Sequence, residues 1–131
     1  MGGGMTARQV TPFSAADGLG AAGHGAGHWW AQRVSAIALA PLALWLTVAL
    51  AGGAAADHAT LTAWLASPVN VMLMVLLLIA AFHHAALGLQ VVAEDYIHSR
   101  TRFVAVGAIH LACIAGAVAG ILAVLRIALS V

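Results

Sequence analysis

The stretch of sequence that decides the fold is residues 69–96, VNVMLMVLLLIAAFHHAALGLQVVAEDY. Residues 69–93 are almost all apolar, and an apolar helix of about 20 residues is long enough to cross a bilayer. Two histidines, His83 and His84, lie inside this apolar run, and an acid pair followed by the only tyrosine of the chain ends it. Because ionisable side chains at membrane depth are costly, their presence indicates a functional role.

The composition of the whole chain is that of a membrane protein. Of its 131 residues, 63% are hydrophobic and 7% are charged, whereas about half of a soluble domain is apolar. A soluble chain of this length has too little interior to bury so much apolar surface, so lipid must be one of its solvents. Five arginines against four acidic residues leave no basic field for nucleic acid. The single cysteine, Cys113, excludes a disulfide within the chain and a multi-cysteine metal site.

Three apolar segments predict an all-α membrane protein with three transmembrane helices, at about residues 34–50, 69–93 and 103–125. Residues 1–27 are rich in glycine and lack periodicity, which predicts a flexible N-terminal segment. Residues 28–131 are then expected to form a single transmembrane anchor domain.

The segments between and within these helices carry local signals. Asp57 is a suitable N-cap for a helix too short to cross the bilayer, which predicts a helix lying at the membrane interface. Ser67 and Pro68 suit the N-cap and the first turn of the second span. Gly107, Gly116 and Gly120 offer small-residue contact faces, and Gly116 and Gly120 have the spacing of a contact face between membrane helices.

The positions of the arginines predict the orientation in the membrane. In a three-span arrangement Arg8, Arg33, Arg100 and Arg102 fall on one side, and Arg126 alone falls on the other. Because loops rich in Lys and Arg stay on the cytoplasmic side, the N-terminus is expected to be cytoplasmic.

Helix geometry indicates which polar groups of the second span can act together. His84 and Asp95 are eleven residues apart, which at about 100° per residue places them on one face, about 16 Å apart along the axis. His83 is rotated away by about 100°. Gly88, one turn from His84, would let a flat ligand or a second helix approach closely.

A neutral imidazole in a helix bundle suits axial ligation of haem iron. One helix supplies only half of a bis-histidine site, so His84 is equally interpretable as a structural histidine bonded to a neighbouring helix. The second ligand would be His110 of the third span or a histidine of another subunit.

Asp95 and Tyr96 lie where the second span reaches the cytoplasmic interface. A tyrosine hydroxyl can donate a hydrogen bond to a carbonyl oxygen and a carboxylate can relay protons, which would suit a quinone head group. The alternative is a tyrosine of the interfacial aromatic belt beside a solvated acid. Arg33 has the same ambiguity: it would pair with a haem propionate or with Asp95, or act only as a membrane anchor.

At these residues the chain resembles a known family, the D subunit of the hydrophobic membrane anchor of succinate dehydrogenase (respiratory complex II). The stretch 28–37, HWWAQRVSAI, is similar to the family's R-x-[ST]-A pattern at the start of its first span. Ser67-Pro68 follows a short tryptophan-containing helix, as in the family. The specific signature is His84-x10-Asp95-Tyr96. The resemblance covers about residues 28–125.

The resemblance implies roles for these residues in a haem-binding helical bundle formed with a partner anchor protein. His84 would be one axial ligand of a b-type haem, with the second supplied by that partner, the C subunit of the membrane anchor. Tyr96 would hydrogen-bond a ubiquinone carbonyl, and Asp95 would tune that network. Arg33 would lie near the haem propionates or the Tyr96 network, with His28 as its neighbour.

The resemblance also implies the setting of the reaction. The chain would be the non-catalytic anchor of succinate:ubiquinone oxidoreductase, a multi-pass protein of the bacterial inner membrane that serves the tricarboxylic acid cycle and respiratory electron transport. A flavoprotein subunit and an iron–sulfur subunit would dock on its cytoplasmic side and carry out succinate oxidation. Two features depart from the family pattern: the His83-His84 doublet, in which the spacing to Asp95 favours His84, and the additional charge of Glu94.

Three other functions compete with this one. A fumarate reductase anchor would run the chemistry backwards, although Asp95-Tyr96 favours ubiquinone reduction by resemblance. A structural three-helix subunit would hold no cofactor, and a haem spectrum would eliminate it. A small transporter subunit would need polar residues spread through several spans, whereas these spans are nearly uninterrupted apolar runs.

Overall fold

A computed structural model describes residues 21–130 of the chain, which form three long helices and one short one. The long helices are α2 (Ala21–Ala51), α4 (Pro68–Tyr96) and α5 (Thr101–Ala128), and α3 (His58–Leu65) is the short one. All three long helices contain segments long and apolar enough to cross a membrane, namely Gly25–Ala51, Pro68–Tyr96 and Thr101–Ala128. The prediction of an all-α fold with three candidate spans is therefore confirmed.

Each long helix extends beyond the apolar segment from which it was predicted. The largest difference is at α2, which begins at Ala21 and so includes residues 21–27, where a flexible segment was expected. Once a helix has formed, adding a residue costs far less than starting a helix, so an apolar helix can extend into neighbouring sequence even where glycines recur, as in residues 21–27. The helix continues through Pro41. The rest of the predicted flexible segment, residues 1–20, lies outside the described part of the chain, as does Arg8.

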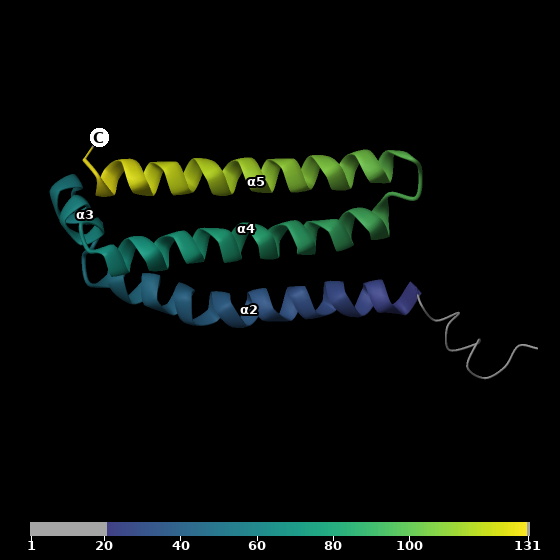
Figure 1. The fold of residues 1–131 in the computed structure, drawn as a ribbon, viewed down its shortest axis with the longest axis horizontal. Helices are drawn as coiled ribbons and strands as arrows, with labels where there is room; N and C mark the ends of the chain where they lie inside the picture. Colours follow the sequence, from purple (N-terminus) through teal and green to yellow (C-terminus); the bar gives the residue numbers. More distant parts are fainter. Residues whose placement is uncertain (1–20, 131) are drawn as a thin grey trace, which may run out of the picture.

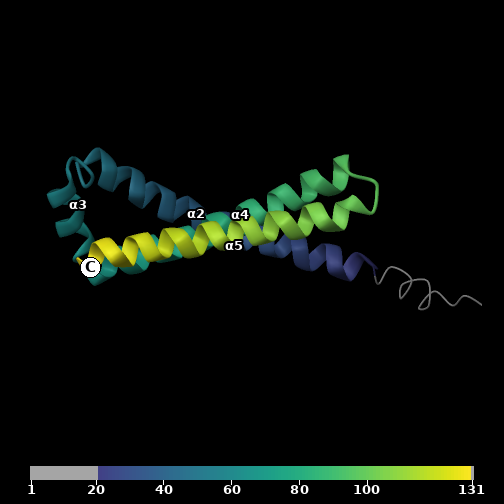
Figure 2. The same cartoon turned by 90° about the horizontal axis from the view of Figure 1, so that it is seen from above.

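The long helices are arranged with α4 in the middle and antiparallel to both neighbours (Figure 1). The N-terminal end of α2 and the link from α4 to α5 lie at one end of the molecule, and α3 lies across the other end (Figures 1 and 2). Helix α4 packs on α2 with one side and on α5 with the other, so it is the central helix of the three.

Helices α4 and α5 approach closely at two glycines of α5. A Cβ atom placed on Gly116 would lie 2.5 Å from the ring of Phe82, and one on Gly120 would lie 3.1 Å from Leu78. No real side chain tolerates the first distance without movement of its neighbour, so Phe82 occupies the space that the missing side chain leaves. The predicted small-residue contact face of the third span is thus confirmed at Gly116 and Gly120, but not at Gly107, where a Cβ would meet nothing within 4 Å in the described chain.

The short helix α3 is capped and docked as its sequence indicates. The carboxylate of Asp57 accepts a hydrogen bond from the backbone N–H of Thr60 at 2.7 Å. The ring of Trp64 stacks on Trp45 of α2 with 5.3 Å between centroids, and Leu65 is only 2% exposed. Ser67 and Pro68 hold the N-cap and first-turn positions of α4, although the Ser67 side chain makes no capping hydrogen bond.

Most large apolar side chains of the three long helices are exposed in the isolated chain. Few apolar residues are buried, and several of these are alanines. The exposed large apolar residues run along the whole length of each long helix. An exposed apolar surface of this extent must be covered by lipid or by partner helices. The chain is therefore a multi-pass membrane protein whose interior is completed by other molecules.

Candidate functional site

His84 of α4 points toward α2, where its ring nitrogen Nδ1 lies 3.0 Å from the hydroxyl oxygen of Ser35. The Ser35 hydroxyl donates a hydrogen bond to the backbone carbonyl of Gln32, at 2.9 Å, in its own helix. Ser35 is only 6% exposed, and it is the only buried polar residue among the described side chains. The interface between α2 and α4 is therefore organised around one hydrogen-bonded histidine.

The other ring nitrogen of His84, Nε2, is available to a ligand. Within residues 21–130 this nitrogen has no hydrogen-bond partner. It is also not enclosed by other atoms, in contrast to the unbonded His28 Nε2 and Gln32 Oε1, so it reaches accessible surface. His84 is about 18 Å along the axis from the end of α4 at Tyr96, because the two are twelve residues apart. The nitrogen therefore lies at mid-membrane depth, where a lone pair is costly unless something binds it.

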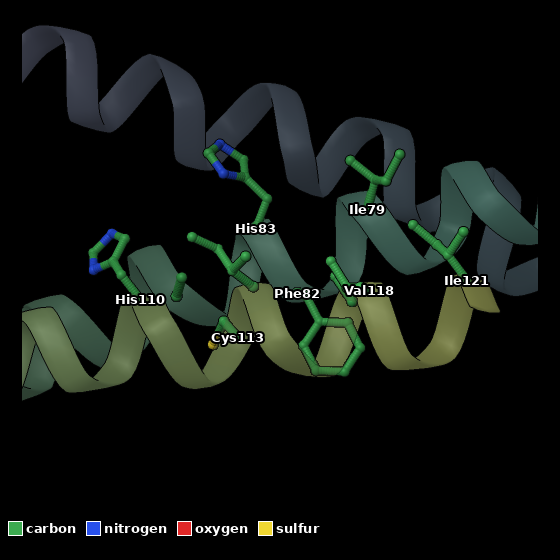
Figure 3. Close-up of a pocket in the computed structure, with 10 residues that line it drawn as sticks. Ile79, Phe82, His83, His110, Cys113, Val118 and Ile121 are labelled. Carbon is green, nitrogen blue, oxygen red and sulfur yellow. The ribbon is translucent and has the colours of Figure 1, made fainter. Parts of the chain in front are cut away.

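His110 lies on a different surface from this hydrogen bond, whereas His83 lines both surfaces, because it also lines a groove between α2 and α4 together with Ser35. His83 and His110 line a groove of about 360 Å³ between α4 and α5, whose other walls are apolar apart from Cys113 (Figure 3). The Nδ1 of His110 bonds to the carbonyl oxygen of Val106 at 3.0 Å, within its own helix. His84 is not part of this groove, so the structure does not bring His84 and His110 together as a ligand pair.

Asp95 and Tyr96 end α4 as exposed side chains, and 83% of Tyr96 is accessible. Within residues 21–130 neither side chain forms a hydrogen bond or an ion pair, with the other or with Arg33. The neighbouring Glu94 accepts a hydrogen bond from Gln90, at 2.9 Å, one turn earlier. The structure therefore brings Asp95 and Tyr96 to one helix end without giving either a partner.

Arg33 lies over the ring of Trp29, with its guanidinium carbon 4.8 Å from the ring centroid. The contact of Ser35 with His84 fixes the register of the antiparallel helices, and it sets Arg33 close to the level of His84. Asp95 is eleven residues beyond His84, so its level along α4 is more than about 10 Å from that of Arg33. This register separates Arg33 from the acid pair within the chain.

A polar stripe on α2 was missed as a unit by the sequence analysis. His28, Gln32 and Ser35 recur at intervals of four and three residues and so share the face that meets α4. The His28 Nε2 and Gln32 Oε1 atoms are enclosed without a hydrogen-bond partner in the described chain. The expected close approach at Gly88 is to the Gln32 side chain, and a Cβ there would be in ordinary contact at 3.7 Å. The intervals of four and three residues between His28, Gln32 and Ser35 were the sequence signal that could have identified this polar face.

Comparisons with known proteins agree with one another. A family model described as succinate dehydrogenase/fumarate reductase transmembrane subunit matches residues 7–124. The chain is 32% identical over 99 residues to the succinate dehydrogenase hydrophobic membrane anchor subunit of Paracoccus denitrificans, an alignment covering 76% of this chain and 77% of the relative. It is 34% identical over 106 residues to the subunit of that name from Rickettsia conorii, covering 79% and 84%. No solved structure gives a significant match.

Proposed function

The chain belongs to the succinate dehydrogenase/fumarate reductase transmembrane subunit family, and on this premise we propose that it contributes one axial haem ligand and one wall of a ubiquinone site. As a membrane anchor subunit of succinate dehydrogenase it holds the complex in the bilayer. Succinate is oxidised in a partner flavoprotein subunit, and its electrons reach ubiquinone through a partner iron–sulfur subunit. The part of this chain is to position the quinone and to supply hydrogen bonds and protons.

The residues around His84 fit a haem group, and this observation carries the proposal. A haem ligand must present an unprotonated ring nitrogen, and its other ring nitrogen is typically held by a hydrogen bond. His84 has this arrangement, since Ser35 holds Nδ1 and Nε2 is accessible. When bound, the haem supplies an iron centre that takes up and releases one electron.

The second axial ligand comes from the partner anchor protein. His110, the candidate within this chain, lines the groove between α4 and α5 and not the surface that His84 reaches. The apolar faces that remain exposed on α2 and α4 leave room for helices of that partner. We assign Arg33 to a haem propionate, and this is supported by its level, which is close to that of His84 and far along the axis from Asp95. His28 lies on the same face of α2 as Ser35, two turns nearer the N-terminus of that helix.

The quinone site lies at the end of α4. Ubiquinone becomes ubiquinol by accepting two electrons and two protons. The Tyr96 hydroxyl donates a hydrogen bond to one quinone carbonyl, and Asp95 orients this network and passes protons from the cytoplasmic side. Because both side chains are exposed and unpaired within the described chain, the site is completed by residues of the partner subunits.

The haem proposal is tested by a reduced-minus-oxidised optical spectrum of the assembled complex. A b-type haem signal is expected in the wild-type complex and in the control His83→Ala, and it should be lost in His84→Ala. The adjacent histidine is a matched control because it has the same chemistry and nearly the same depth but forms no hydrogen bond to Ser35 in the described chain. A normal bis-histidine spectrum in the His84→Ala complex would overturn the assignment.

A further inference from the structure

We propose that Ser35 is the positioning residue for His84: its hydroxyl selects the imidazole tautomer that presents Nε2 to iron and holds the ring in place. The inference rests on the proposed haem role of His84. Its basis is a chain of two hydrogen bonds, from His84 Nδ1 to Ser35 at 3.0 Å and from Ser35 to the Gln32 carbonyl at 2.9 Å.

The direction of this chain follows from counting protons. A serine hydroxyl has one hydrogen, and a backbone carbonyl oxygen can only accept. Because the Ser35 hydrogen is committed to the Gln32 carbonyl, Ser35 offers only a lone pair to His84. The hydrogen of that second bond must therefore sit on His84 Nδ1. A neutral imidazole carries one ring hydrogen, so Nε2 is left with the lone pair that a metal needs.

The same reasoning explains why His84 and not its neighbour is the ligand. His83 forms no hydrogen bond within the described chain, so neither its tautomer nor its ring orientation is determined. His110 does have a determined tautomer, but its partner is the Val106 carbonyl one turn earlier in the same helix. Of these three histidines, only His84 is held from another helix within residues 21–130, which couples the packing of α2 on α4 to the position of the ligand.

A purely structural role for the Ser35–His84 bond is less consistent with its surroundings. A histidine that only joins two membrane helices would gain from satisfying both ring nitrogens, because an unpaired polar atom in the bilayer is costly. Here Nδ1 is bonded to Ser35, which is only 6% exposed, while Nε2 is left accessible. This asymmetry is the arrangement that supporting hydrogen bonds give to histidine ligands of metals.

The bond also affects the chemistry of the iron. A hydrogen bond accepted from Nδ1–H makes the imidazole a stronger donor at Nε2. A stronger donor favours ferric over ferrous iron, so loss of the bond should move the haem midpoint potential to more positive values. Loss of such supporting partners typically weakens metal binding by about 10- to 100-fold, and haem should leave the variant complex faster by a similar factor.

The experiment compares Ser35→Ala, Ser35→Val and Ser35→Thr in the assembled complex. Two quantities are measured: the haem midpoint potential by redox titration, and the rate of haem transfer to an excess of apomyoglobin. Ser35→Ala and Ser35→Val should shift the potential upward and release haem faster, whereas Ser35→Thr should keep wild-type values. Threonine and valine have nearly the same shape, so their comparison isolates the hydroxyl from the packing, and it serves even where Ser35→Ala fails to assemble.

The matched control is Thr47→Ala in the same helix. Its hydroxyl also bonds to a backbone carbonyl, that of Ala43 at 2.8 Å, but it is exposed and meets no histidine. This variant should leave both quantities unchanged. If Ser35→Val and Ser35→Thr behave alike, the positioning role is wrong, while haem loss in His84→Ala would still support the haem site. Haem that survives His84→Ala would instead overturn the proposed function.

Discussion

Tyr96 combines an exposed side chain with a fixed position at the end of a transmembrane helix. Its hydroxyl has no hydrogen-bond partner within residues 21–130, and 83% of its surface is accessible. A phenol at the bilayer surface can donate to water, to a lipid head group or to a bound carbonyl oxygen. Only the last of these makes the hydroxyl matter for the reduction of ubiquinone.

We expect Tyr96→Phe to lower ubiquinone reductase activity by roughly five- to tenfold, which corresponds to one lost hydrogen bond of about 1–1.4 kcal/mol. Succinate oxidation with an artificial acceptor should stay at the wild-type rate, because that reaction does not reach the quinone site. Steady-state assays with the two acceptors measure both. The control is Phe103→Leu, which removes an exposed aromatic ring in the first turn of α5, just after the link that follows Tyr96. Unchanged turnover with ubiquinone in Tyr96→Phe would make Tyr96 a residue of the aromatic belt.

At the scale of helices, the contact of α4 with α5 depends on a missing side chain. A Cβ on Gly116 would overlap the ring of Phe82, with 2.5 Å between the atoms. Overpacking of this kind costs about 1–3 kcal/mol, whereas alanine in place of glycine favours a helix by about 1 kcal/mol. The steric cost should therefore prevail, and Gly116→Ala is expected to destabilise the complex by about 1 kcal/mol, measured as a lower midpoint of thermal unfolding in detergent.

Gly107 provides the control, since a Cβ there would meet nothing within 4 Å. Gly107→Ala gains the higher helix propensity of alanine without a steric cost, so it should leave stability unchanged or raise it slightly. The difference between the two variants reports the steric cost alone. Equal midpoints would show that Phe82 moves aside freely, into the groove that its ring lines.

The stability of helix α3 is expected to depend on pH through its N-cap residue, Asp57. The backbone N–H of Thr60, hydrogen-bonded to Asp57, lowers the pKa of that carboxyl below its ordinary value of 3.8. A group whose pKa is lower in the folded state stabilises the fold above its unfolded pKa, and it loses this contribution as the pH falls through the folded pKa. The first turn of α3 should therefore loosen only below about pH 3.8, observed as lost hydrogen-exchange protection of the Thr60 amide.

The variant Asp57→Asn separates the charge from the hydrogen bond. Asparagine is also a good N-cap residue, but its side chain does not titrate. We expect protection at Thr60 in this variant to be independent of pH over the same range. A pH dependence equal to that of the wild-type chain would assign the transition to another group.

At the scale of the whole molecule, the three long helices leave much of their apolar surface uncovered. Helix α4 is flanked by α2 and α5 (Figures 1 and 2), yet exposed large apolar residues remain on all three helices. One chain therefore builds half of a site: His84 has a held Nδ1 and an accessible Nε2, and Tyr96 has no partner in the described chain. Partner subunits must complete both.

The end of the molecule that holds the N-terminus of α2 and the α4–α5 link is proposed to be cytoplasmic. Arg100 and Arg102 lie in the α4–α5 link and the first turn of α5, at this end, and α3 lies at the other end (Figure 1). With the native cysteine replaced (Cys113→Ala), Ser99→Cys should react with a membrane-impermeant maleimide only in inverted vesicles, and Ala56→Cys only in intact cells or spheroplasts. The opposite pattern would reverse the topology. The Cys113→Ala chain without added cysteines is the unlabelled control.

Much of this architecture is determined by local sequence alone. The apolar runs are sufficient to predict three spans, because crossing a bilayer requires about 20 apolar residues whatever their neighbours are. Asp57 and Pro68 identify helix starts, because capping involves residues three or four positions apart. The alignment of His84 with Asp95 follows from the helical repeat.

Contacts between helices were decided only by the tertiary structure. The sequence contains His83 and His84 side by side, and Ser35 lies 49 residues away from the histidine that it meets. Which histidine meets the serine, and which side chain of α2 lies against Gly88, depend on how α2 crosses α4. Crossing and register result from the packing of many side chains at once, so no local pattern in the sequence contains them.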